Sequence, residues 1–247
     1  MTGIAILVAL LLLTTGATVK GLIGVGLPMI AIPGLALFFG LPAALAIVVL
    51  PVLAANLWQV WQFRACYEPG GSVVRFLIAG GCGTVLGTLI LISVPERALE
   101  LTLAAILTGY IVLRLTNPEI ALGAGRARRI APPIGLSAGL LQGSTGISGP
   151  VVITFFHGQR PSRPEFVFAT GAVYATFSGV QLMSLAVSGV LTLDRLAAGV
   201  AGLPAVALGL WLGNRIARHV DQRLFDKLVL VLLAWTAAAL VWKNLAG

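Results

Sequence analysis

Lys20 is the residue of this 247-residue chain whose type and position point most directly to chemistry. It follows an apolar run, residues 4–19, and begins a glycine- and proline-rich segment that ends at Pro28. A charge at membrane depth is costly and by default marks a functional site, although a lysine can also extend to an interface. The break favours a site, because the N-terminus of a broken helix offers free N–H groups and a positive dipole end. We expect Lys20, Gly24 and Gly26 to bind a small anion.

A second segment of the same kind lies 122 positions further along the chain. The residues from Gln142 to Pro150 match the first segment, with Gln142 in the place of Lys20. The proposed site therefore has one fixed positive charge. The second copy adds three hydroxyls that the first copy lacks, at Ser144, Thr145 and Ser148. Hydroxyls donate hydrogen bonds to oxyanions and also cap broken helices, and these two interpretations are compatible.

Polar side chains recur on the apolar run that follows each break. Asn56 and Gln59 lie about one helical turn apart in the first copy, and Gln181 is the equivalent of Gln59. We expect the two glutamines to face the axis between the copies and to contact the anion. The alternative is that they form hydrogen bonds between membrane helices. In the second copy, residues spaced 4, 4 and 3 share one helix face: Thr170, Tyr174, Ser178 and Gln181.

An enzyme is the alternative raised by the segment Gly146 to Gly149, which fits the G-x-S-G motif of rhomboid-type intramembrane serine proteases. Catalysis by Ser148 would need a histidine base within reach. His157 would approach it only in an unusual hairpin, and His219 lies in a basic loop. We therefore predict that the protein is not an enzyme, and we assign no catalytic residue. The sequence shows no metal-ligand cluster or phosphate loop, so we predict neither a metal nor a cofactor.

The composition places these residues in a membrane protein. Hydrophobic residues make up 58% of the chain and charged residues 10%, whereas a soluble domain has roughly 25% charged residues. Apolar runs separated by short loops fill the length, so we predict an all-α polytopic protein in contact with the lipid bilayer. The net charge of +8 is interpreted as the cytoplasmic excess of Lys and Arg. Nucleic acid binding is excluded because no polar domain exists to carry it.

The two breaks belong to two related halves. A constant shift of 122 also superposes Pro42 on Pro164, Gly80 on Gly202 and Gly87 on Gly209. The predicted organisation is a first repeat (1–116), a basic cytoplasmic linker (117–131) and a second repeat (132–247). Duplicated halves with broken helices are common in secondary transporters. Residues 133–141 and 151–157 are each too short to span a bilayer, which favours a re-entrant hairpin over a kinked spanning helix.

The positive charges discriminate between these two topologies. If each broken segment crosses the membrane, Lys and Arg divide 8 to 7 between the sides. If each returns to its own side, they divide 12 to 3, with Lys20 in the membrane in both cases. The positive-inside rule favours the second arrangement, in which each repeat makes three full crossings, the repeats are inverted and both termini are periplasmic. The three on the outer side are Arg97, Arg195 and Lys243.

These motifs resemble the sulfite exporter TauE/SafE family. The first-repeat signature is Gly21-x-x-Gly24-x-Gly26 followed by Pro33-Gly34-Leu35, and the second runs from Gly139 through Gly143 to Gly146. The run from Leu208 to Val241 resembles the last two helices of the family. The chain departs from the family where the triple glycine is broken in both copies and where Phe155-Phe156-His157 replaces the second P-x-L. Both departures lie at the proposed site.

The resemblance implies transport of a small anion such as sulfite, sulfate, thiosulfate or an organosulfonate across the bacterial inner membrane. The expected mechanism is alternating access, in which one repeat rocks against the other. An anion channel with the same site is the nearest alternative. The sequence leaves open which anion is carried, the direction of transport, the coupling ion (H⁺ or Na⁺) and the oligomeric state.

Overall fold

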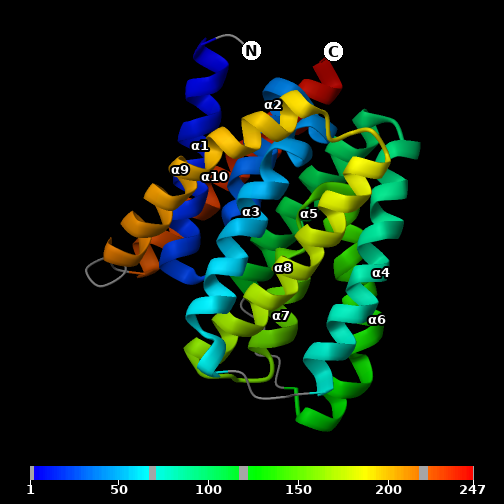
Figure 1. Ribbon diagram of the computed structural model, residues 1–247, viewed down its shortest axis with the longest axis vertical. Coiled ribbons are helices and arrows are strands. Elements are labelled where there is room, and N and C mark those ends of the chain that lie inside the picture. Colours follow the sequence, from blue (N-terminus) through cyan, green and yellow to red (C-terminus); the bar gives the residue numbers. More distant parts are fainter. Residues whose placement is uncertain (1–2, 67–70, 117–121, 217–221, 247) are drawn as a thin grey trace.

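A computed structural model describes residues 3–66, 71–116, 122–216 and 222–246. Within these ranges the chain is helical and contains no strand, which confirms the predicted all-α fold (Figure 1). The α-helices are α1 (Gly3–Ile23), α2 (Leu27–Phe39), α3 (Leu41–Gln62), α4 (Gly71–Ser93), α5 (Glu96–Thr116), α6 (Ala124–Thr145), α7 (Gly149–His157), α8 (Arg163–Val187), α9 (Leu193–Ile216) and α10 (Gln222–Ala246). A short 3₁₀ helix, η1 (Arg64–Cys66), follows α3.

Four of the described helices, α3, α4, α8 and α9, are long and apolar enough to cross a membrane. The sequence predicts a third crossing in each half, and the helices at those positions, α5 and α10, have 21 and 25 residues. Both carry more charged residues than the other four. The chain is a multi-pass membrane protein.

The two broken segments return to the end of the bundle at which they begin. At the second break, the Leu122 N–H just before α6 donates to the Gly158 carbonyl just after α7, over 2.7 Å. At the first, the Ala36 carbonyl near the end of α2 accepts a 3.2 Å hydrogen bond from Lys243 near the C-terminus. Both termini lie at that same end of the molecule (Figure 1). A hairpin, and not a kinked spanning helix, is therefore the structure of each break.

The helix before the second break is longer than the sequence predicts. α6 begins at Ala124, so residues 124–131 of the predicted linker form its first two turns and residues 133–141 are not a separate short helix. Pro132 and Pro133 lie inside this helix, so the apolar segment that the sequence predicts from residue 133 begins within the helix and not at its start. Residues 117–121 of the linker lie outside the described residues.

Two helix pairs, each joining a helix of one half to a helix of the other, are equivalent to one another. α1 packs against α9, and α6, the counterpart of α1 at a shift of 122, packs against α4, the counterpart of α9. Glycines bring the backbones together in both pairs. A Cβ on Gly21 would lie 2.7 Å from the Leu210 carbonyl oxygen, and one on Gly143 would collide with the Thr84 carbonyl. α3 packs against its own counterpart α8 between these pairs.

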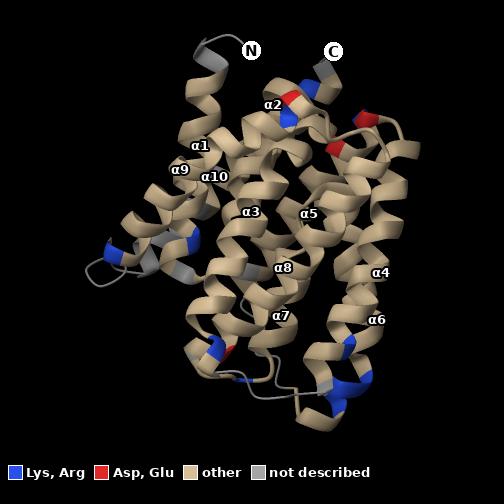
Figure 2. Ribbon diagram, viewed as in Figure 1, with Lys and Arg blue, Asp and Glu red and all other residues tan. Residues whose placement is uncertain are grey.

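Lys and Arg gather toward the end of the bundle away from the termini (Figure 2). This arrangement is the one that the hairpin topology predicts. Arg218 lies outside the described residues, as does His219.

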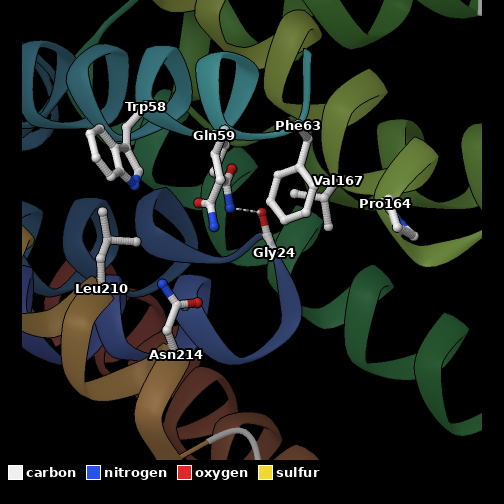
Figure 3. Close-up of a pocket in the computed structure, with 10 residues that line it drawn as sticks. Gly24, Trp58, Gln59, Phe63, Pro164, Val167, Leu210 and Asn214 are labelled. Carbon is white, nitrogen blue, oxygen red and sulfur yellow. Dashed lines mark hydrogen bonds between the residues drawn. The ribbon is translucent and has the colours of Figure 1, made fainter. Parts of the chain in front are cut away.

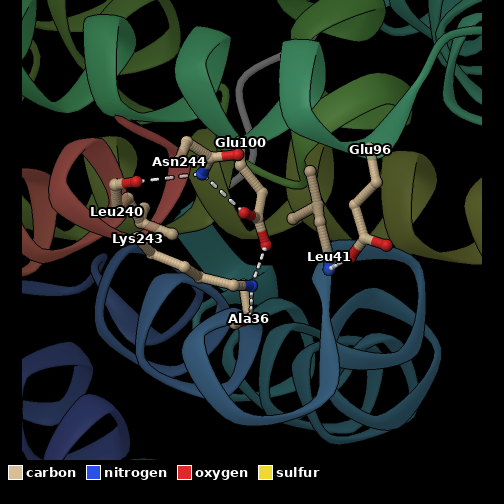
Figure 4. Close-up of polar contacts among 7 residues, drawn as sticks. All are labelled: Ala36, Leu41, Glu96, Glu100, Leu240, Lys243 and Asn244. Atoms are coloured by element: carbon tan, nitrogen blue, oxygen red, sulfur yellow. Dashed lines mark hydrogen bonds and ion pairs between the residues drawn. The ribbon is translucent and has the colours of Figure 1, made fainter. Parts of the chain in front are cut away.

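The end of the bundle that holds the termini is stabilised by an ion pair between a buried carboxylate and a partly exposed ammonium. The Lys243 ammonium lies 2.7 Å from the carboxylate of Glu100, whose residue is 2% exposed (Figure 4). The same carboxylate accepts a 2.7 Å hydrogen bond from Asn244. One turn earlier on α5, Glu96 accepts a 2.7 Å hydrogen bond from the Leu41 N–H at the start of α3. α5 and α10 are thus tied to the end of the first hairpin.

Lys243→Met is expected to lower the melting temperature of the detergent-solubilised protein by about 4–8 °C, because it leaves the Glu100 carboxylate buried without its cation. This fall is at the low end of the range for breaking a buried ion pair, because the Lys243 side chain is 41% exposed. Lys243→Arg keeps the charge and serves as the control. Equal melting temperatures for the two variants would show that the pair contributes nothing.

Candidate functional site

The two hairpin turns bring two helix N-termini together in the centre of the bundle. Gly24 and Gly26 have φ values of 87° and 120° and Gly146 has 74°, a region that side-chain-bearing residues rarely adopt. These glycines end α1 and α6 and let the chain reverse into α2 and α7. A Cβ on Gly149, at the start of α7, would lie 3.0 Å from the sulfur of Met29 in the first turn of α2. The starts of the two short helices are therefore in contact.

Lys20 lies beside the first turn and is 2% exposed. Its Nζ donates to the Asn56 Oδ1 over 2.7 Å and to the Gly24 carbonyl over 3.3 Å. Gln59 donates from Nε2 to the same carbonyl over 3.2 Å. Lys20 therefore does not extend to an interface. It points at the helix break, and three of the predicted residues surround it.

The equivalent positions of the second half form a neutral cluster. Gln142 Nε2 donates to Gln181 Oε1 over 3.0 Å, and Gln181 Nε2 donates back to the Gln142 carbonyl over 2.8 Å. The Ser148 hydroxyl donates to Gln142 Oε1 over 2.9 Å, and Tyr174 packs against Ser148 with 6% of its surface exposed. Ser178, the counterpart of Asn56, is buried and its hydroxyl has no hydrogen-bond partner.

The remaining predicted hydroxyls are satisfied by their own helices. Ser144 donates to the Leu140 carbonyl and Thr145 to the Leu141 carbonyl, over 2.7 and 2.8 Å. Thr170 bonds within α8 in the same way. Ser148 is the N-cap of α7 but makes no side-chain capping bond. Gln59 and Gln181 each hydrogen-bond within their own half, so the structure gathers the predicted residues into two related clusters.

A cavity of about 270 Å³ reaches the Lys20 cluster from one end of the bundle. Gly24 and Gln59 form its inner wall, and Asn214, Trp58 and Val167 are among the residues that line it (Figure 3). Phe63 and Pro164 also line it. Phe63 directly follows α3 and Pro164 lies in the first turn of α8, so the cavity lies toward the basic end of the molecule.

The space beside the Gln142 cluster is nearly closed. A second cavity there measures only about 10 Å³, which is the space of about one water molecule. It is lined by Pro28 at the start of α2, by apolar residues of α3, and by Gln142, Ser178 and Gln181. The anion could occupy this position only after the helices around it move apart.

The arrangement does not form a serine hydrolase site. Ser148 and His157 lie at opposite ends of α7, about 13 Å apart along the helix axis. The hydroxyl donates to Gln142, while the His157 ring meets Phe166 edge-on. His157, the histidine within the described residues, therefore does not adjoin Ser148.

The family model for the sulfite exporter TauE/SafE matches residues 7–240. The chain belongs to this family. It is therefore a membrane transporter and not an enzyme, which confirms the resemblance found in the sequence. No curated protein and no solved structure matches the chain.

Two features of this TauE/SafE protein were not predicted from its sequence. Asn214 lines the open cavity although it lies near the end of α9, and nothing in its spacing connects it with Gln59. Glu100 is deeply buried although it lies in the second turn of α5, where a carboxylate is expected near the membrane surface. The sequence signal for Glu100 was its spacing: it lies one helical turn after Glu96, so the two acids share one face of α5.

Proposed function

We propose that the protein carries a small sulfur-containing anion (sulfite, sulfate, thiosulfate or an organosulfonate) across the bacterial inner membrane by alternating access. The observation that carries this proposal is Lys20, a buried cation beside a hairpin break and without an ion-pair partner within the described part of the chain. An isolated buried charge costs several kcal/mol, so its presence is best explained by an anion that binds there. The substrate site that we propose comprises both clusters.

Two inverted repeats underlie the mechanism in this proposal. The equivalent helix pairs α1–α9 and α6–α4 each join a helix of one repeat to a helix of the other, and they support a two-fold relation between the repeats, with α3 and α8 next to its axis. Within the described residues, the cavity at the basic end and the much smaller cavity beside Gln142 support a transporter that is open toward the basic end. By the positive-inside rule the basic end is cytoplasmic, and the termini are then periplasmic.

The test is anion flux into proteoliposomes with the wild type and Lys20→Gln side by side. The wild type is expected to show saturable flux of at least one of these anions, and the variant about 100-fold less, because a buried charged partner has been removed. Arg195→Gln, which removes a positive charge on α9 at the opposite end, is the matched control and should retain full flux.

Other outcomes would contradict parts of the proposal. Flux that does not saturate would indicate a channel. Flux that Lys20→Gln leaves unchanged would move the binding site away from Lys20. Repeating the measurement with an imposed H⁺ gradient and then a Na⁺ gradient identifies the coupling ion, since the coupled gradient alone should drive accumulation.

A further inference from the structure

We infer that the site around Lys20 takes singly charged oxyanions and discriminates against doubly charged ones. This inference rests on the proposed function, since it concerns the charge of the anion that this site would carry. It narrows the substrate to alkanesulfonates and hydrogensulfite, in preference to sulfate, thiosulfate and doubly charged sulfite.

The first step is the count of buried charges. Among the described residues, the charged side chains that are fully buried are Lys20 and Glu100. Glu100 is paired with Lys243 at the far end of the bundle, so that pair is neutral. Lys20 contacts only neutral acceptors, the Asn56 amide oxygen and the Gly24 carbonyl. The site thus has a net charge of one.

The second step is the donor that remains available. A protonated lysine has three N–H donors, and Asn56 and Gly24 accept from two of them. The third is left for a ligand. The two acceptors orient the ammonium toward the break between α1 and α2, where the start of α2 adds its own positive dipole end.

The third step is the neutrality of the other half. At the position equivalent to Lys20, Gln142 exchanges hydrogen bonds with Gln181 and accepts one from Ser148. These amides and hydroxyls solvate an anion but do not balance its charge. No second cation joins the site within the described residues, so the two related clusters provide one positive charge between them.

The consequence follows from the cost of net charge in a dry environment. A monoanion at Lys20 leaves the site neutral, whereas a dianion leaves one negative charge in surroundings of low polarity. Methanesulfonate and sulfate have nearly the same shape, since a methyl group replaces one oxygen. Shape therefore discriminates little between them, and charge becomes the main difference.

The experiment compares the flux of methanesulfonate and sulfate in the same proteoliposomes. We expect the wild type to prefer methanesulfonate by about tenfold or more in saturable flux at equal concentration. Gln142→Lys places a second cation at the equivalent position and should raise sulfate flux relative to methanesulfonate by about tenfold. Gln142→Met, which removes the same amide without adding charge, should not raise sulfate flux relative to methanesulfonate.

A double variant that moves the lysine from one half to the other distinguishes the effect of the number of charges from the effect of their position. Lys20→Gln/Gln142→Lys again has one cation, so it should transport less sulfate relative to methanesulfonate than Gln142→Lys does. If Gln142→Lys does not yield folded protein, the test rests on the wild type. Its flux ratio of methanesulfonate to sulfate, together with that of ethanesulfonate to thiosulfate, then supports or overturns the inference. Equal wild-type flux of both charge classes would overturn the inference while leaving the proposed function intact. Absence of saturable flux for every anion would overturn the proposed function and the inference with it.

Discussion

Lys20→Met is expected to abolish anion flux without lowering the melting temperature of the protein. Removing the ammonium takes away an unpaired buried charge, which relieves a desolvation cost of several kcal/mol. It also leaves the Asn56 Oδ1 without its 2.7 Å donor, at a cost of about 1–3 kcal/mol. The Gly24 carbonyl keeps its bond from Gln59. These two changes in the free energy of unfolding nearly cancel, so we expect the melting temperature to stay within about 3 °C of the wild-type value.

The double variant Lys20→Met/Asn56→Leu sharpens this expectation. It removes the orphaned acceptor together with the charge, so its melting temperature should exceed that of the wild type by about 2–6 °C. Both variants should show no saturable flux. Thermal unfolding in detergent and flux in proteoliposomes, measured on the same preparations, check the two effects together. A drop of more than about 5 °C in the single variant would show that Lys20 holds the fold together, and a purely structural role would then explain its burial.

The sequence predicts the helical class, the two breaks and the return of each hairpin because each depends on local signals. Glycine at positive φ is needed at Gly24, Gly26 and Gly146, and proline in the first turn of α2 and α7 is typical of helix starts. Charge asymmetry decided the topology, since twelve positive residues share one side only if both breaks return. These features can be predicted without tertiary contacts.

The division of the site into two clusters could not be predicted in this way. Gln59 and Gln181 occupy equivalent positions, and the sequence favours a shared orientation toward the axis. In the structure each bonds to the break of its own half, at Gly24 and Gln142 respectively. A buried amide forms the bond that its packed neighbour offers, and the neighbour is known only once the helices are placed. The start of α6 at Ala124 was also not predicted, because a Pro-Pro pair inside a helix contradicts the low helix propensity of proline.

Gly139→Ala is expected to destabilise the protein strongly, with a fall in melting temperature of about 6–12 °C or failure to accumulate as folded protein. A Cβ at this position would collide with the Gly80 carbonyl oxygen and would lie 2.8 Å from the Thr84 nitrogen. Both are backbone atoms of α4 and cannot rotate away as a side chain would. α4 and α6 must therefore separate, and close approach through small residues is what holds membrane helices together.

Gly109→Ala is the matched control because it makes the same chemical change within a long helix. Gly109 lies in α5, and a Cβ there would meet nothing within 4 Å. Alanine is the better helix former by about 0.5–1 kcal/mol, so this variant should melt at the wild-type temperature or slightly above it. Fluorescence-detected size exclusion and thermal unfolding report both variants. If Gly139→Ala behaves like Gly109→Ala, the α4–α6 backbones are further apart than the structure places them.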